Sequence, residues 1–328
     1  MENFPLVSYC VKCYNQERYI GEALRAAFVQ TYSPLEILIC DDASTDRSDE
    51  IIRTLIQEYQ MSGGRHKVRY FRNERNLVNL GNWQHMCELA EGELLVKADG
   101  DDFSAPERTQ ELVDVWMKSG KINNEVISDG TAISKVGQKL WYIKWNVSLG
   151  LGGLAAFTKR CFEEFPPLID GVSHEGADDV VYVNRGEMLG GVIDYVPKSL
   201  VFYRQGSGET SSGINYVKMM TRGFRFMCAS ARQLLADLEF RKEKLSKVDY
   251  DRFRGRFEWM EKHHRALLEL WLGESYGRRK AAFLLLMELK TYNPILGRFL
   301  LLPRWITAST LNTLYWLRCK VKFFKIRS

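Results

Sequence analysis

The sequence Glu93-Leu94-Leu95-Val96-Lys97-Ala98-Asp99-Gly100-Asp101-Asp102 joins an apolar run to a dense group of carboxylates. The apolar run has the length and composition of a buried strand, and Pro106 shortly after it is suited to open a helix. Carboxylates at the end of a buried strand repel one another and lose hydration, which is tolerable mainly when a cation lies among them. Oxygen ligands suit Mg²⁺ or Mn²⁺, which share their coordination shell with water and diphosphate. The stretch therefore predicts a divalent metal site, although any one Asp could instead cap the helix at Pro106.

Apolar runs and helical patterns alternate along the chain before this strand. Strands are expected at 6–11, 35–40 and 68–71, and helices at 20–29, 48–59 and 81–90. The alternation predicts a parallel sheet covered by helices, and such sheets bind ligands in the crevice outside the carboxyl ends of their strands. Asn15, Asp42 and Asp101 all follow such ends. We therefore expect these three residues to line one cleft.

Short motifs accompany the expected elements between Val7 and Pro106. In chain order they are Tyr14-Asn15-Gln16-Glu17, Gln30-Thr31-Tyr32, Glu36-Ile37, Asp41 to Asp46, Asn76, Asn82, Glu91-Gly92-Glu93 and the Asp cluster. Together they resemble the nucleotide-sugar-binding half of the family 2 glycosyltransferases, which are inverting enzymes of the GT-A fold. Fainter similarity continues at 152–162, 178–190 and 200–204, which resemble the family's acceptor-side segment, its segment with the catalytic base and its closing strand.

The resemblance implies an α/β catalytic domain over residues 1–213. Its fold would be of the GT-A type, a Rossmann-like mixed sheet flanked by helices. The nucleotide-sugar half is expected at 1–105 and the acceptor half at 106–213. Arg, Lys and Glu at helical spacing follow residue 214 and predict a C-terminal helical extension, basic and amphipathic, over 214–328.

The resemblance also implies a set of donor-binding residues. The donor would be a nucleotide sugar, most simply a UDP-sugar, whose nucleotide contacts Asp42 with help from Asn15 and Glu17. Asp99 and Asp101 would hold Mn²⁺ or Mg²⁺ across the two phosphates, with Asp102 as an additional carboxylate. Further residues expected to bind the nucleotide sugar are Asn76, Gly100 and Arg204.

Asp179 would be the catalytic base by the same resemblance. It would remove a proton from an acceptor hydroxyl as that hydroxyl attacks the anomeric carbon, and direct displacement would invert that centre. The bound metal would neutralise the charge of the departing nucleoside diphosphate. Asp178 and Asp179 also open a helix, where carboxylates are favoured by the macrodipole, so capping is the alternative role. Arg185 and Leu189-Gly190 favour the catalytic interpretation.

One position departs from the family pattern. Many relatives carry a His two residues after the residue that corresponds to Arg204, and Gly206 stands there in this chain. We expect residues 205–212, which are rich in Gly and Ser, to form a flexible lid with weaker metal dependence. A plain linker between domains is the alternative.

Composition indicates an intracellular globular enzyme. The chain has 328 residues, of which 45% are hydrophobic and 27% charged, which is enough to bury a full core and suggests about two domains. Residues 1–5 have neither a basic region nor an apolar core, so no secretory signal is expected. Seven Cys, several in expected strands, favour reduced thiols in a cytosol. Cys10 and Cys13 would face opposite sides of a strand, which argues against a zinc site.

Basic residues concentrate at the C-terminal end. From Arg278 to Ser328 there are eleven Lys or Arg and one acidic residue, interleaved with Trp, Phe and Leu. The longest uncharged run, 305–317, is too short and too polar to cross a bilayer. The segment predicts helices that lie on an anionic membrane surface, and hence a peripheral location on the cytoplasmic face of the cell membrane. Packing on the catalytic body or on a second subunit is the alternative. Nucleic-acid binding is not expected, because no recognised nucleic-acid-binding fold accompanies the basic segment.

The sequence thus predicts a glycosyltransferase that acts on a lipid-linked or polymeric glycan. A nucleotidyltransferase would also use an Asp-bound metal on a parallel sheet, but it would release pyrophosphate. A degenerate relative could bind glycan or serve as a scaffold without catalysis. The presence of Asp42, Asp99, Asp101 and Asp179 argues against such decay.

Overall fold

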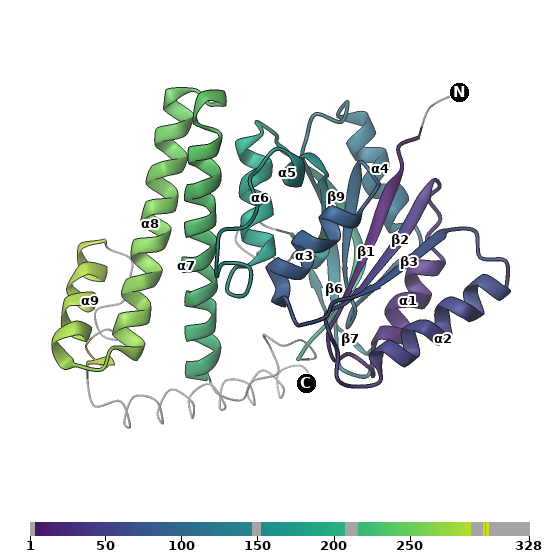
Figure 1. The fold of residues 1–328 in the computed structure, drawn as a ribbon, viewed down its shortest axis with the longest axis horizontal. Coiled ribbons are helices and arrows are strands. Elements are labelled where there is room, and N and C mark those ends of the chain that lie inside the picture. Colours follow the sequence, from purple (N-terminus) through teal and green to yellow (C-terminus); the bar gives the residue numbers. More distant parts are fainter. Residues whose placement is uncertain (1–3, 146–151, 207–215, 290–297, 299, 302–328) are drawn as a thin grey trace. The chain divides into compact units, whose positions relative to one another are not determined.

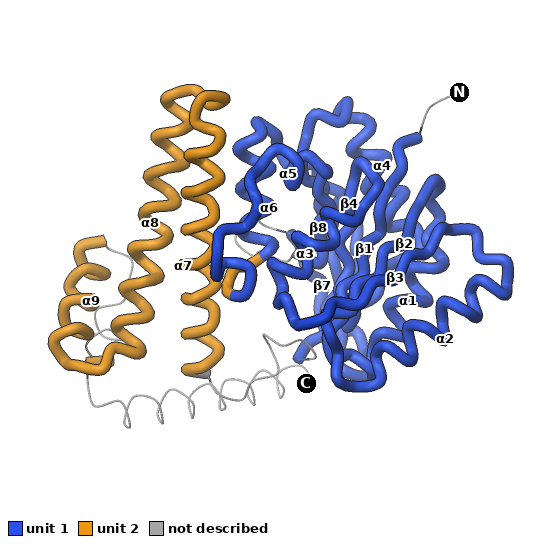
Figure 2. The backbone as a smooth tube through the Cα atoms, in the orientation of Figure 1, with its two compact units in different colours: residues 1–174, 178–207 blue, residues 175–177, 208–328 orange. Residues whose placement is uncertain are grey.

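The computed structural model describes residues 4–145, 152–206, 216–289, 298, 300 and 301. The chain divides into two compact units, residues 1–174 with 178–207 and residues 175–177 with 208–328 (Figure 2). The domain boundary expected at residue 213 falls in the segment 207–215, outside the described residues. Asp99, Asp101 and Asp179 all belong to the first unit.

The described part of the first unit contains a nine-stranded sheet in the order β3-β2-β1-β4-β8-β6-β9-β5, with β7 paired to β6. The strands β3, β2, β1 and β4 are parallel, as the alternating sequence pattern predicts (Figure 1). β8 is antiparallel to both β4 and β6, so the sheet is mixed. The strands are β1 (Val7–Cys13), β2 (Leu35–Asp41), β3 (Lys67–Arg72), β4 (Leu94–Asp99), β5 (Phe103–Ser104), β6 (Glu125–Ile133), β7 (Lys139–Ile143), β8 (Ala155–Thr158) and β9 (Ile193–Arg204).

Helices cover both faces of this sheet. On one face, α1, α2 and α4 pack against alternate residues of the central strands. On the other face, Trp83 of α3 and Tyr182 of α6 contact Phe157 of β8, with ring centroids 6.3 and 5.9 Å from it. The helices are α1 (Ile20–Phe28), α2 (Ser48–Met61), α3 (Val78–Leu89), α4 (Arg108–Lys118), α5 (Arg160–Glu163) and α6 (Asp178–Met188), with a 3₁₀ turn η1 (Gly152–Leu154).

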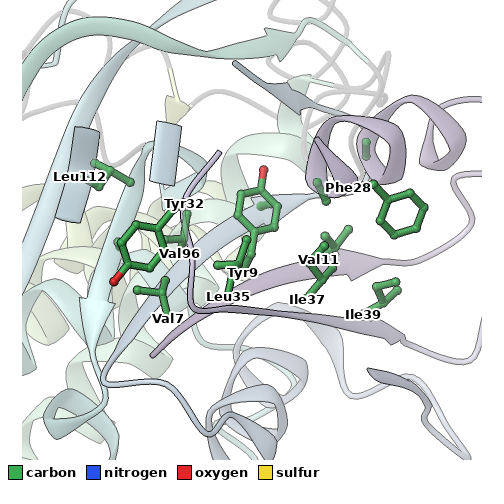
Figure 3. Packing of buried hydrophobic residues seen from close by; sticks show 14 of the residues in the cluster. Val7, Tyr9, Val11, Phe28, Tyr32, Leu35, Ile37, Ile39, Val96 and Leu112 are labelled. Atoms are coloured by element: carbon green, nitrogen blue, oxygen red, sulfur yellow. The ribbon is translucent and has the colours of Figure 1, made fainter. Parts of the chain in front are cut away.

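The hydrophobic core lies on the α1/α4 face. Val7, Val11, Ile37 and Val96 are completely buried there, and Leu112 of α4 packs against the same cluster (Figure 3). Side chains alternate between the two faces of a strand. The residues next to Val11 and Val96 therefore point to the α3/α6 face, and these include the two charged residues in otherwise apolar strands, Lys12 and Lys97.

The second unit is helical in its described part. It consists of α7 (Tyr216–Phe240), a 3₁₀ turn η2 (Lys242–Lys244), α8 (Lys247–Leu272) and α9 (Tyr276–Glu288). α7 and α8 lie side by side (Figure 1). Phe224 of α7 and Trp271 of α8 share a core with Leu286 of α9. Among the described residues, the helices are either too short or too polar to cross a bilayer.

The first part of the basic C-terminal segment belongs to this helical core. Arg279 is buried and donates to the backbone oxygen of Leu300, while Ala282 and Leu286 of α9 contact the cluster around Trp271. α9 therefore packs on α7 and α8 of its own unit, which neither the membrane expectation nor the packing alternative had named. The prediction that the basic segment binds a membrane surface now concerns residues 302–328, which lie outside the described residues.

Candidate active site

Two loops at the carboxyl ends of β1 and β2 are fastened to each other. The Asn15 side-chain oxygen accepts the Thr45 N–H at 2.8 Å, and the Asn15 N–H donates to the Ser44 hydroxyl at 2.9 Å. Glu17 accepts the Arg47 N–H at 3.1 Å. Asn15 has a φ of 51°, in the left-handed region that Asn tolerates better than most residues. Asn15 and Glu17 thus fix the backbone that follows Asp42.

Asp42 lies between these loops and the start of α3. It is 3% exposed and accepts hydrogen bonds from the Asn73 amide at 2.7 Å and the Leu77 N–H at 2.8 Å. Burial raises the pKa of Asp42 in spite of these bonds. Asn76 accepts the Val78 N–H at 2.7 Å and so shapes the same loop. The structure brings Asn15, Asp42 and Asn76 to one edge of the sheet, while their contacts with a nucleotide stay a prediction.

The Asp cluster follows β4 at this edge. The Gly100 N–H donates to the backbone oxygen of Lys12 at 2.8 Å, and a Cβ at Gly100 would come within 2.7 Å of that oxygen. Only glycine fits such a close approach. A Cβ at Gly153 would come within 2.9 Å of Asp99 Oδ2. The absence of a side chain at Gly100 lets the Asp loop approach β1, and its absence at Gly153 leaves room for the Asp99 carboxylate.

The carboxylates of this cluster repel one another. Asp102 is buried and accepts the Arg204 N–H at 2.7 Å. Burial, followed by the negative charges of Asp101 and Asp99, raises the pKa of Asp102 well above its ordinary value. A divalent cation among these oxygens would relieve that repulsion. The donor chemistry therefore fits Mg²⁺ or Mn²⁺.

The cluster has too few ligands for a metal cage made of protein alone. In the described ranges, no three His, Cys, Asp or Glu side chains are grouped so that they could hold a metal ion. Mg²⁺ is usually bound by one or two carboxylates together with waters and substrate phosphates, so two carboxylates suffice. The assignment of Asp99 and Asp101 as ligands stays a prediction.

Arg204 holds the Asp loop from the side of β9. Its guanidinium is buried, donates to the backbone oxygens of Asp101 and Lys135 at 2.9 Å each, and pairs with Glu22. It also lies over the ring of Tyr19, 4.7 Å from the centroid. A contact between Arg204 and a donor phosphate stays a prediction. Most of the expected lid, from residue 207 onwards, lies outside the described residues.

A buried ion cluster lies beneath the Asp loop, and the sequence patterns did not predict it. Lys12 Nζ is 2.7 Å from Asp178 Oδ2 and 3.2 Å from Asp99 Oδ1, and Lys97 Nζ is 2.9 Å from Asp178 Oδ2. Burial alone would raise the pKa of Asp178, but the two ammonium groups hold it well below its ordinary value. The signal in the sequence was a single Lys inside each of two apolar runs. Nothing in those runs showed which carboxylate each Lys would meet.

The pKa of Asp179, the next residue along α6, is shifted in the opposite direction to that of Asp178. Burial, followed by the negative charge of Asp178, raises the pKa of Asp179 to about 6. Glu125 of β6 is 4% exposed, and burial together with the charge of Asp179 raises the pKa of Glu125 to about 7. A carboxylate that titrates near neutrality is suited to accept a proton from a substrate. The arrangement therefore separates an ion-paired Asp178 from an Asp179 whose pKa is raised, and the role of Asp179 as the base stays a prediction.

Sequence comparison relates part of this chain to known glycosyltransferases. The family model Glycosyl transferase family 2 matches residues 8–146. EpsE of Bacillus subtilis (strain 168) is 30% identical over 113 residues, which make up 34% of this chain and 39% of that protein. The chain thus spans well under half the length of this curated relative.

Solved structures share the fold at low sequence identity. TarS 1–349 of S. aureus, in complex with UDP-GlcNAc, has a TM-score of 0.56 at 15% identity and covers 95% of this chain and 91% of its own. The mannosyltransferase PcManGT from Pyrobaculum calidifontis, in complex with GDP-Man and Mn²⁺, has a TM-score of 0.50 at 16% identity, with 95% and 88% covered. The expected GT-A type fold, a mixed sheet flanked by helices, is confirmed.

We expect Asp178→Asn to destabilise the fold far more than Asp179→Asn. The first substitution leaves two buried ammonium groups without their shared counter-charge, and breaking a buried pair costs about 3–5 kcal/mol. The second removes a carboxylate whose pKa is raised in the folded state, so its ionised form opposes folding at pH values above the unfolded pKa. Urea denaturation at pH 7.5 measures both. Equal losses of unfolding free energy would contradict the ion cluster.

Proposed function

We propose that this chain, whose residues 8–146 match the family model Glycosyl transferase family 2, transfers a sugar from a nucleoside diphosphate to a hydroxyl, with inversion. The donor is most simply a UDP-sugar, since TarS is known in complex with UDP-GlcNAc, although PcManGT is known with GDP-Man. One observation carries the proposal. The ionic path from Asp99 through Lys12 to Asp178 joins the donor carboxylates to the helix that bears Asp179.

Asp179 acts as the general base in this proposal. The acceptor hydroxyl gives its proton to the Asp179 carboxylate as its oxygen attacks the anomeric carbon from the side opposite the leaving diphosphate. The bond to the acceptor oxygen forms while the bond to the phosphate oxygen breaks, which inverts the anomeric centre. Asp178 cannot take this role while it is ion-paired, because Lys12 and Lys97 hold its pKa far below neutrality.

Asp99 and Asp101 would hold a divalent cation at the donor phosphates. When bound, the cation stabilises the negative charge that develops on the departing diphosphate. Gly153 keeps the space beside Asp99 open, and Arg204 fixes the backbone of Asp101. The presence of Mn²⁺ in the PcManGT complex supports this proposal.

The acceptor would be a lipid-linked or polymeric glycan at the cytoplasmic face of a membrane. Residues 302–328 carry six Lys or Arg and no acidic residue, together with Trp305, Trp316, Phe323 and Phe324. Each Lys or Arg near an anionic leaflet contributes about 1 kcal/mol to binding, and aromatic side chains favour the headgroup region. A contact with a second subunit is the competing role for the same residues.

The donor proposal predicts metal-dependent binding of UDP. In thermal unfolding experiments, UDP with Mn²⁺ should raise the melting temperature more than UDP alone, and Asp101→Asn should abolish the difference. The affinity for uridine, measured by calorimetry, should change little because uridine has no phosphate. Equal losses for UDP and uridine would remove the metal bridge. Release of pyrophosphate during turnover would instead identify a nucleotidyltransferase.

Asp179→Asn should abolish sugar transfer without loss of donor affinity. A general base contributes roughly two to four orders of magnitude in rate, and Asn cannot accept the proton. In the unsubstituted protein, kcat/KM should fall as the pH drops below about 6, because Asp179 is then protonated. The residual kcat/KM of Asp179→Asn should not show this fall at low pH. Near-normal transfer by Asp179→Asn would place the base elsewhere.

The membrane proposal predicts that residues 302–328 confer binding to anionic vesicles. The truncation should begin after Leu301, because removal of α9 would expose the core around Trp271. Co-sedimentation with phosphatidylglycerol vesicles should be lost on truncation and should weaken with added salt. A truncated protein that sediments as well as the full chain would assign the segment to subunit packing.

A further inference from the structure

A buried carboxylate organises three aromatic residues on the acceptor half of the sheet. Asp129 of β6 is 2% exposed, and its Oδ1 accepts the Trp145 N–H at 2.6 Å. The Tyr195 hydroxyl lies 2.8 Å from both Asp129 oxygens, and the Tyr142 hydroxyl donates to Oδ2. Each hydrogen bond that the structure shows to the Asp129 carboxylate thus comes from an aromatic residue, either from its hydroxyl or from its backbone N–H.

These rings are fixed but not buried. The Tyr142 side chain is 53% exposed, while Trp145 and Tyr195 are half-buried with ring centroids 5.4 Å apart. Phe103 and Phe202, both half-buried, stack at 4.6 Å on the neighbouring strands β5 and β9. Aromatic residues that served only the core would be covered. We call these five residues, Phe103, Tyr142, Trp145, Tyr195 and Phe202, the aromatic strip.

Strand register places the aromatic strip on the same face of the sheet as Asp179. Tyr142 and Phe202 are both paired with Thr131, which is on the same face of β6 as Asp129 and Glu125. Glu125 is paired with Phe157, whose ring contacts Tyr182, three residues after Asp179 on α6. Because Glu125 also interacts electrostatically with Asp179, the strip and Asp179 lie on the same side of the sheet.

The strip also begins beside the donor carboxylates. Phe103 directly follows Asp102, and its strand β5 pairs with the end of β9 that carries Arg204. The residues expected to bind the nucleotide lie at β1 and β2, which are separated from β6 by β4 and β8. The strip is therefore placed for the substrate that approaches Asp179 and not for the nucleotide base.

We propose that the aromatic strip is the acceptor subsite and binds consecutive sugar rings of a glycan chain. The inference rests on the proposed function and specifies a chain of sugars as the acceptor class. The C–H faces of pyranose rings stack on aromatic rings, and sugar hydroxyls can hydrogen-bond to the phenol groups of Tyr142 and Tyr195. Asp129 holds both phenols before any ligand arrives, which reduces the entropy lost on binding. Hydrogen bonding to Asp129 raises the pKa of Tyr142 to about 12, so the phenol keeps its proton at neutral pH.

The test is binding of the full-length protein to an array of bacterial and animal glycans of one to six sugars, in the presence of UDP and Mn²⁺. We expect binding to oligosaccharides and not to monosaccharides. Tyr142→Ala and Trp145→Ala should each weaken it by about fivefold or more, since each removes one stacking ring. Tyr142→Phe keeps the ring and should retain most of the binding, which separates loss of stacking from misfolding.

Trp141→Ala is the matched control. Trp141 is 46% exposed and adjoins Tyr142 on β7, but it is paired with Ala132 and so faces the other side of the sheet. Trp141→Ala should therefore leave glycan binding unchanged. The proposal would be overturned if Trp141→Ala lost as much glycan binding as Tyr142→Ala and Trp145→Ala. It would also be overturned if the unsubstituted protein bound no glycan. Stabilisation by UDP is measured in every variant: if it persists while glycans fail to bind, the strip is wrong and the donor function stands.

Discussion

The arrangement of the catalytic unit depends on the pairing of Asp178 with Lys12 and Lys97. An ammonium group buried without a counter-charge would lose several kcal/mol of hydration, so β1 and β4 each carry a residue that must find a carboxylate. The carboxylate comes from a helix 81 or more residues further along the chain. The pairing therefore fixes where α6 begins relative to the two central strands. Hydrophobic contacts alone, which are not directional, would allow that helix to slide.

The same pairing explains why two adjacent Asp residues differ in chemistry. Asp178 contacts both ammonium groups and remains ionised under all ordinary conditions. Asp179 lies next to that negative charge and is itself desolvated, so its pKa rises to about 6. One carboxylate is thus used for structure, and this makes its neighbour a better proton acceptor at neutral pH. The capping role considered for both residues from sequence is too weak to account for this difference.

The parts of the fold that could be predicted from sequence are those with strong local patterns. Three of the four parallel strands, β1, β2 and β4, are largely apolar runs because both of their faces are buried. The later strands gave no comparable pattern, since β5 has two residues and β8 has four. Asp99, Asp101 and Asp179 could be proposed as site residues because motifs mark them, whereas Lys12, Lys97 and Asp129 act only through partners distant in sequence. The sequence shows that such a residue is charged, but it does not show which residue will pair with it.

The balance of charge around the Asp loop supports a cation at the donor phosphates. Six carboxylates lie near four cationic side chains in this region: Asp99, Asp101, Asp102, Asp178, Asp179 and Glu22 against Lys12, Lys97, Arg108 and Arg204. Burial, followed by the negative charge of neighbouring carboxylates, raises the pKa values of Asp102 and Asp179. A nucleoside diphosphate would add further negative charge. Lys12 and Lys97 already pair with Asp178, so the charge of an arriving diphosphate must be balanced from outside the ion cluster, as a divalent ion between Asp99 and the phosphates would do.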